Sequence, residues 1–488
     1  MTSRIISIIY ILTIAVFLPT LTHAYDFSLG ENAYLEIKGD ITYSARFRME
    51  DPDPLLVNIT QGNKNFDKGD IVNNKFTGRL EATLDAPYTT LFARFYALRD
   101  DVYEDDDKYP AGTDIGEAKD YAFQGIHVPE FYIDLHNDSL TFRLGKQIIE
   151  WGEMIGPVQA PGVSVINMFD ASKAGAAGYT FRDYKVPVMS GWLSWEATNY
   201  LSLEAVYSTD FEPRDSLPVV GTFQSFLNMM GWGGPTPLMD VQIPTGSEDR
   251  QYGAAARMVI PALKDLELGF YYAHYIDFNP FIYLDFFSTP PVRVTYEDMD
   301  MYGMSFSQAF DALGGFSLYG ELTYRPNQPA QLVNVFGPVA GPEEVRKVNW
   351  GLGASWMLSD FFPFTPWSIQ FSPMLDFYGG TNLDYDDPAY NFLMPDDGAW
   401  YMINLTFSSA DMVDNTVLSL TVAFSGGLHE EEKGFYSIGT TLTARIGDNL
   451  GLMFGYDIKG GDPNEAITYP GWVPDRDALT LGITWYFM

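Results

Sequence analysis

The stretch Leu35–Glu50 reads LEIKGDITYSARFRME, and its side chains alternate without a break. Odd-numbered positions are apolar or glycine, and every even-numbered position is polar or charged. Because successive side chains point to opposite faces of a β-strand, the pattern predicts a strand with one apolar and one charged face. Such a strand fits a half-buried soluble sheet, or a barrel with lipid outside and water inside.

The same two-residue period recurs through the chain in segments of about ten residues. The clearest later segments are Lys75–Ala86, Thr90–Arg99, Leu266–Tyr275, Phe316–Arg325, Tyr401–Ser409, Leu418–Ser425, Tyr436–Ile446, Leu450–Ile458 and Ala478–Phe487, and weaker ones cover 129–135, 140–147, 188–196, 200–208, 251–260, 300–309, 347–357 and 367–377. Together they predict about 18 strands, within roughly 16 to 20, and single-chain bacterial barrels have even strand numbers.

The connections between these segments are alternately short and long. His136–Asp138 and Gly447–Asn449 are short, whereas 148–187 and 209–250 are long. Short periplasmic turns and long extracellular loops are typical of transmembrane barrels, and a soluble sandwich has no such alternation. We therefore predict an all-β fold, a transmembrane antiparallel β-barrel.

The N-terminus indicates export. Arg4 precedes the apolar run Ile5–Leu21, and Thr22–Ala24 forms a small-x-small cleavage pattern. These features predict a secretory signal peptide over residues 1–24 and one barrel domain over residues 25–488. The alternative is an N-terminal membrane anchor, which a proline within the run and the polar segment after it disfavour. The predicted location is the outer membrane of a Gram-negative bacterium.

Composition limits the partners. The chain has 29 Lys+Arg against 64 Asp+Glu, a net charge of −35, so nucleic acid is an unsuitable partner. The acidic excess lies mainly in loops, for example at Asp384–Asp387 and Glu430–Glu432. Such clusters are ordinary solvated surface, or they bind divalent cations that bridge to lipopolysaccharide. The chain has no cysteine.

The last strand suggests how the protein reaches its membrane. Leu479–Phe487 alternates apolar and polar residues and ends in an aromatic residue, with Met488 after it. This resembles the C-terminal signal read by the outer-membrane assembly machinery. Lipid and lipopolysaccharide are the expected surroundings of a closed barrel.

Charged residues of both signs lie on the polar faces of the predicted strands. In the structural interpretation, the acidic and basic side chains of the lumen form ion pairs with one another. In the functional interpretation, they form a charged ring that sets ion selectivity. The balance of signs argues against a strongly polyanion-selective pore. The candidate wall residues are Arg46, Arg48, Arg79, Glu81, Arg94, Arg143, Glu321 and Arg325.

Loops 148–187 and 209–250 are too apolar to be ordinary surface loops. The first contains Trp151 and the run Val163–Phe169, and the second is rich in Phe, Met and Trp. We expect at least one of them to fold into the lumen or mouth as a constriction, or the loops to pack on one another as a lid. The candidate constriction residues are Trp151, Glu153, Asn167, Asp170 and Arg182.

Catalysis has little support in the sequence. After signal cleavage only His127, His136, His274 and His429 remain, and their spacing fits no metal site. Hydrolases of the serine type need a histidine beside a nucleophile and an acid, and no segment predicts that group. We expect no enzyme activity, no metal and no cofactor.

Four stretches of the chain form recognisable motifs: Gly62–Asp70, Arg143–Gln147 followed by Trp151–Glu153, Val165–Asp170 and Gly320–Asn327. Together they resemble an outer-membrane family catalogued as domain of unknown function 1302. Val165–Asp170 is similar to the family stretch INVINPVD but departs from it at Met168 and Phe169. The resemblance implies a barrel whose relatives often accompany transport genes for hydrophobic compounds or lipids. Alginate-export-type barrels are more distantly similar in size, but a basic lumen suits alginate.

The leading hypothesis is a passive outer-membrane channel for a small organic solute, hydrophobic or amphipathic, gated by inward-folded loops over a charge-balanced lumen. The resemblance leaves room for a periplasmic or inner-membrane transport partner. The alternative is a plugged barrel that acts as an adhesin, envelope scaffold or docking platform. A general porin is the third hypothesis, which the Met-rich and aromatic loops disfavour.

Overall fold

The computed structural model describes residues 25–487 with gaps. Residues 59, 155–161, 168, 171, 174–175, 212–217, 226–238, 243–249, 278–280, 285–291, 331–342, 360–368, 385–398, 410–415, 429–435 and 462–473 are not described. The predicted signal peptide and the acidic stretches 385–387 and 430–432 therefore lie outside the described residues.

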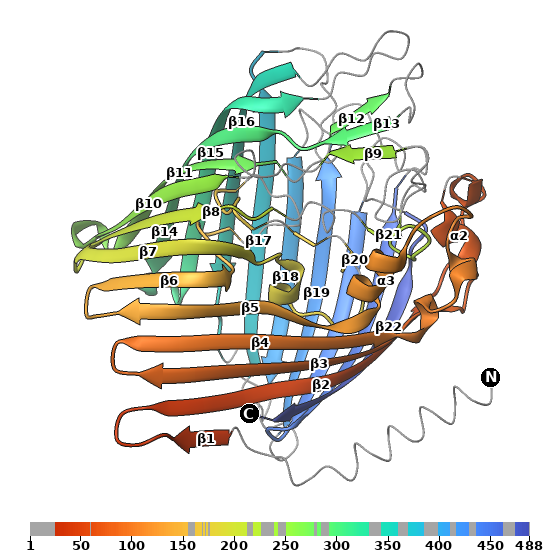
Figure 1. Ribbon diagram of the computed structural model, residues 1–488, viewed down its shortest axis with the longest axis horizontal. Helices are drawn as coiled ribbons and strands as arrows, with labels where there is room; N and C mark the ends of the chain where they lie inside the picture. The colour runs from red at the N-terminus through yellow and green to blue at the C-terminus, as the bar shows by residue number, and fades with distance from the viewer. Residues whose placement is uncertain are drawn as a thin grey trace.

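The wall is one antiparallel sheet that closes on itself (Figure 1). It has 18 strands, and the short β1 (Tyr25–Ser28) pairs with the first of them. The barrel strands are β2 (Tyr34–Arg48), β3 (Ile71–Ala86), β4 (Thr89–Asp100), β5 (Gln124–His136), β6 (Leu140–Gln147), β7 (Val188–Thr198), β8 (Leu201–Ser208), β10 (Gln251–Ile260), β11 (Leu266–Ile276), β14 (Asp298–Phe310), β15 (Phe316–Ala330), β16 (Glu343–Trp356), β17 (Ile369–Asn382), β18 (Ala399–Ser409), β19 (Thr416–Leu428), β20 (Tyr436–Ile446), β21 (Leu450–Gly460) and β22 (Ala478–Phe487). Strand β22 pairs with β2, so Phe487 lies opposite Gly39 and the barrel has no free edge.

The fold prediction is confirmed, including the alternation of short turns with long loops. Strands β6, β10 and β20 have the predicted bounds. The structure differs at β15, which was expected to end at Arg325 but continues to Ala330. The register shifts between Arg325 and Gln328, where Pro326 cannot donate a ladder hydrogen bond, so the strand resumes after a bulge.

Burial along the wall is the reverse of that in a soluble protein. On β2, the side chain of Ile41 is 48% exposed whereas Arg48 is fully buried. The same contrast holds for Leu144, which is 52% exposed, and Lys75, which is 1% exposed. An apolar outer face and a polar inner face are what a barrel in lipid requires.

The long connections carry small elements of their own. The helices among the described residues are η1 (Leu56–Asn58), α2 (Gln61–Asn65), η2 (Asp101–Tyr103), η3 (Asp106–Lys108), α3 (Gly116–Ala122), η4 (Phe181–Tyr184), η6 (Pro261–Leu263) and η7 (Asp311–Leu313). None of them is long and apolar enough to cross a membrane. A second sheet joins β9 (Met239–Gln242), β12 (Phe281–Leu284) and β13 (Val292–Thr295), at the upper right in Figure 1. Four-residue strands are too short for their alternation to be recognised in the sequence.

Candidate functional site

The segment between β6 and β7 (residues 148–187) is tied together at its root. Asn167 Oδ1 accepts a hydrogen bond from the backbone N–H of Ile149 at 2.7 Å. Its Nδ2 donates to the carbonyl oxygens of Gln147 at 3.1 Å and Val186 at 2.8 Å. One buried amide side chain therefore joins the start and the end of this β6–β7 segment, as the hydrogen-bonding capacity of asparagine allows.

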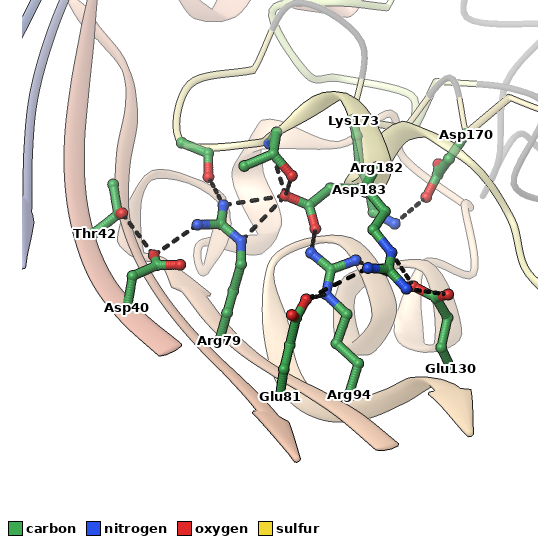
Figure 2. A network of polar contacts seen from close by, with 12 residues as sticks. Asp40, Thr42, Arg79, Glu81, Arg94, Glu130, Asp170, Lys173, Arg182 and Asp183 are labelled. Carbon is green, nitrogen blue, oxygen red and sulfur yellow. Dashed lines mark hydrogen bonds and ion pairs between the residues drawn. The ribbon is translucent and has the colours of Figure 1, made fainter. Parts of the chain in front are cut away.

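The β6–β7 segment is anchored to the wall near β3 and β4 through Asp183 of η4 (Figure 2). Its carboxylate accepts a hydrogen bond from Arg79 Nε at 3.1 Å and one from Arg94 Nη2 at 2.6 Å. The backbone N–H and the hydroxyl of Thr180 also donate to it, each at 2.7 Å. Asp183 thus neutralises two arginines that project inward from different strands.

Arg182 extends this anchor to β5. Its guanidinium donates two hydrogen bonds of 2.7 Å to the two oxygens of Glu130, a bidentate pair. Glu81 lies 3.7 Å from Arg182 and 3.3 Å from Arg94. Figure 2 shows these side chains as one continuous network of alternating sign, which also reaches Asp40 on β2.

The charge state of Asp183 follows from its surroundings. Burial disfavours the charged carboxylate, but Arg79, Arg94 and the hydrogen bonds from Thr180 outweigh burial. Together they hold the pKa of the Asp183 carboxyl below its ordinary value. The anchor is therefore ionised at neutral pH.

A second anchor lies on β15, where Glu321 receives the start of the β6–β7 segment. Its carboxylate accepts backbone hydrogen bonds from Glu153 at 2.6 Å, Met154 at 2.8 Å and Val163 at 2.9 Å. Gly152 turns with a φ of +83°, and a Cβ there would lie 2.1 Å from Glu321 Oε1. Only glycine tolerates both that backbone conformation and that approach.

Arg325, four residues further along β15, holds the same stretch from another side. It donates to the carbonyl oxygen of Gly162 at 3.2 Å and to the hydroxyl of Tyr275 at 2.8 Å. The β6–β7 segment is thus bound at two separate parts of the wall, β3–β5 and β15.

Apolar packing fills the space between the segment and the strands from β7 to β14. Trp151, Val163 and Ile166 belong to one buried cluster with inward-facing side chains of these strands. The remaining members are Ile149, Val165, Val188, Val206, Ala255, Tyr271, Ala273, Tyr275, Met299 and Met301. The indole N–H of Trp151 donates to Glu204 at 3.0 Å, so its polar atom is satisfied in this interior.

The predicted constriction residues divide into a buried group and a partly exposed group. Trp151, Asn167 and Asp170 are buried, and Asp170 is bound by Tyr121 at 3.0 Å and by Lys173. The side chain of Arg182 remains 41% exposed, and Glu153 is partly exposed. Burial and the charge of Glu267 raise the pKa of Glu153 above its ordinary value.

The predicted wall residues all lie on barrel strands, and most are ion-paired. Besides the contacts above, Arg46 binds Asp457 at 3.1 Å and Arg143 binds Asp134 through two hydrogen bonds of 2.6 and 2.7 Å. Arg48 donates to the Asp475 carboxylate at 2.9 Å. Glu321 and Arg325 instead bind the backbone of the β6–β7 segment.

Part of the second long loop packs at the barrel mouth. Phe223 shares a buried cluster with Phe66 and Tyr103, which come from two other loops. The guanidinium carbons of Arg48 and Arg476 lie 5.7 and 4.9 Å from the centre of its ring. Within residues 209–250, the structure describes 209–211, 218–225, 239–242 and 250.

Sequence reasoning missed two acidic residues that organise the lumen. Asp183 was overlooked because its partners lie about a hundred positions away, although the Thr180–Asp183 spacing matches a capping pattern. Glu204 was overlooked as the acceptor for Trp151 and Trp192, since alternation alone gives no pairing. Among the described residues, no group of three or more His, Cys, Asp or Glu could hold a metal ion.

A family model described as "Protein of unknown function (DUF1302)" matches residues 5–487. No curated protein matches the chain. Among solved structures, OccAB2 of Acinetobacter baumannii is 11% identical with a TM-score of 0.50, covering 93% of this chain and 98% of that one. A BenF-like porin from Pseudomonas fluorescens Pf-5 is 10% identical with a TM-score of 0.49, covering 93% and 98%.

The structure of OpdK from Pseudomonas aeruginosa with vanillate is also similar, at 9% identity and a TM-score of 0.45, covering 92% and 98%. The likeness to OccAB2 is one of fold, and it agrees with the closed wall. The protein is a β-barrel of the outer membrane of a Gram-negative bacterium, as predicted.

Proposed function

This chain belongs to the family described as "Protein of unknown function (DUF1302)", and from that premise we propose that it is a channel. A small organic solute, hydrophobic or amphipathic, diffuses through the lumen past the β6–β7 segment, which forms the constriction. The observation that carries the proposal is the double anchoring of this segment, at Asp183 on one side and at Glu321 on the other.

The anchors explain how a loop can narrow a pore without depending on the loop's own stability. Charge-assisted hydrogen bonds are the stronger kind, and both anchors consist of them. Among the predicted constriction residues, Glu153 and Arg182 are the two whose side chains remain open to solvent. We propose that these two side chains face the solute path, whereas Trp151, Asn167 and Asp170 position the segment.

Single-channel recording in planar bilayers tests the proposal. The mature protein is expected to give discrete current steps, and deletion of residues 148–187 is expected to raise their size. Migration of unheated and heated protein in gels would verify that each variant forms a folded barrel. Equal conductance before and after the deletion would refute the constriction.

A matched pair of variants tests the role of Arg182. Arg182→Gln removes a half-exposed charge inside the barrel, whereas Arg99→Gln removes one that is 60% exposed and paired with Asp101 near the end of β4. We expect the first change to shift the reversal potential in a salt gradient and the second to leave it unchanged. Equal shifts would mean that Arg182 does not face the ion path.

The runner-up function is a plugged barrel used as a scaffold, adhesin or docking platform. It is favoured by the complete burial of charged inner side chains such as Lys75 and Glu130. A folded protein that stays silent, both intact and after deletion of residues 148–187, would support this function and contradict a channel.

A further inference from the structure

The inner face of β18, β19 and β20 differs from the rest of the wall in its chemistry. Strands β18 and β19 contain no charged residue, and β20 contains one, Arg445, beside its terminal turn. Serine, threonine and other small neutral residues alternate there with large apolar ones. The neutral set on the described parts of these strands is Asn404, Thr406, Ser408, Ser419, Thr421, Ala423, Ser425, Ser437, Gly439, Thr441 and Thr443.

Strand register shows that this neutral set faces the lumen. Asp457 on β21 binds the inward-facing Arg46 and lies opposite Gly439 on β20. Side chains two positions apart share a face, so Thr441 points inward with Gly439. Thr441 is paired with Thr421, and Thr421 with Thr406, which carries the inner face across all three strands.

These inner side chains remain accessible, unlike the threonines of β2 and β3, two strands that follow β20, β21 and β22 around the wall. Thr42 and Thr77 point inward from β2 and β3 and are 6% and 2% exposed. Thr421 and Thr441 are partly exposed, and Thr443 is exposed. Because the residue type is the same, the difference comes from what covers it, so the open part of the lumen lies beside β18–β20.

The contacts of the β6–β7 segment explain the asymmetry. They run over β3–β5 through Arg182 and Asp183, and over β15 through Glu321. A Cβ at Gly351 on β16 would lie 3.1 Å from Met154 of the segment. The contacts of the segment thus stop short of β18, and the neutral wall is left uncovered, as far as the described residues of the chain extend.

We infer that the solute path is eccentric, runs between the β6–β7 segment and the hydroxyl wall of β18–β20, and takes an uncharged amphipathic solute that forms hydrogen bonds. This inference rests on the proposed channel function. Thr406 and Thr421 hydroxyls lie 3.1 Å apart, and those of Ser408 and Ser419 lie 3.4 Å apart. Each hydroxyl can donate once and accept twice, so capacity remains for a passing hydroxyl or amide.

The wall disfavours an ion for the same reason. A charged solute beside β18 and β19 would lose part of its hydration shell without meeting a fixed counter-charge. A neutral polar solute exchanges its hydrogen bonds with water for equivalent ones with the wall.

Single-cysteine variants test the position of the path, since the natural chain has no cysteine. Thr421→Cys and Thr77→Cys replace inward-facing threonines on the open and the covered wall. A charged, membrane-impermeant methanethiosulfonate reagent is expected to label Thr421→Cys quickly and to reduce its conductance by roughly half or more. Thr77→Cys is expected to be protected and its conductance unchanged.

Two outcomes separate this inference from the channel function itself. Conductance that persists unchanged after labelling of Thr421→Cys would overturn the eccentric path and leave the channel standing. A folded wild-type protein without conductance would overturn the channel, even if Thr421→Cys is labelled. Val422→Cys, which faces outward, provides the control for labelling from the lipid side.

Liposome swelling tests the solute class. We expect ribitol, a neutral polyol that probes the hydrogen-bonding part of such a solute, to enter several-fold faster than gluconate of similar size. Thr421→Asp should slow gluconate further, since it adds a negative charge to the neutral wall. Faster entry of gluconate than of ribitol would refute the neutral solute.

Discussion

The β2–β5 wall and the β18–β20 wall belong to one continuous sheet but present opposite interiors. The first carries charged side chains that the β6–β7 segment covers, for example Arg94, which is 3% exposed. The second carries hydroxyls that remain accessible, for example Thr443. Both have the same antiparallel backbone pairing, so the difference lies in their side chains and in what covers them.

The comparison shows what decides where a lumen segment lies. Inward-facing arginines deprived of water are costly unless an acid replaces the lost hydration. Asp183 supplies that replacement for Arg79 and Arg94 at once. The hydroxyl wall of β18–β20 needs no such acid, because water can form the hydrogen bonds of its hydroxyl groups. This wall therefore stays open.

Asp183→Ala should produce the largest effect. It leaves Arg79 and Arg94 buried without their shared partner, and breaking a buried ion pair costs about 3–5 kcal/mol. Urea unfolding in detergent micelles measures the loss, and current recordings should show larger and noisier steps. Ser419→Ala on the open wall is the control, with little expected change. Equal stability of the two variants would contradict the proposal that the β2–β5 wall depends on a buried anchor and the β18–β20 wall does not.

Glu321→Gln should have the next largest effect. The amide keeps one oxygen for Glu153 and Met154 but turns an NH2 group toward the N–H of Val163. Loss of a hydrogen bond to a charged acceptor costs about 1.5–3 kcal/mol. Hydrogen exchange of the Val163 amide should accelerate, while that of Ile149, held by Asn167, should not. Unchanged protection at Val163 would show that Glu321 is not the anchor.

Acidification should lower the free energy of unfolding by less than either substitution, because it weakens only the Asp183 anchor to β3 and β4. Because the pKa of Asp183 is lowered in the folded protein, its stabilising contribution is present above the ordinary carboxyl pKa of 3.8. The contribution is lost as the pH falls through the lowered value. The unfolding free energy should therefore fall between pH 5 and pH 2 more steeply in the wild type than in Asp183→Asn. Parallel curves would contradict a role for this carboxylate.

Thr406→Val should have the smallest effect on stability. It removes the hydroxyl contact with Thr421, which is worth about 0.5–1.5 kcal/mol at most and less where water can replace it. Ribitol entry should nevertheless slow, because the path loses one hydrogen-bonding group. A stability loss as large as that of Asp183→Ala would show that the open wall is as tightly organised as the covered one.

The wall could be predicted from the sequence because each strand obeys a local rule. Leu140–Gln147 and Tyr436–Ile446 were located to the residue by alternation alone. Lipid outside and water inside impose the same period on every strand, so the pattern repeats regardless of register.

The interior could be predicted only in part. The sequence singled out residues 148–187 by their unusual apolar content, and it placed arginines such as Arg79 on inner faces. It did not predict that Asp183 joins Arg79 and Arg94, because no periodicity relates loop residues to wall residues distant in the chain. Nor did it predict the uncovered wall, since coverage depends on where the β6–β7 segment finds its partners.

Pairing of β22 with β2 means that the wall has no beginning in space, although the polypeptide has one. A circular permutant with joined native ends and new ends at the Gly447–Asn449 turn would preserve every strand neighbour. Leu479–Phe487 would then lie inside the chain, and a different strand would emerge last from the ribosome. Such a permutant changes the position of each strand along the polypeptide while keeping its position around the pore, so the two can be tested separately.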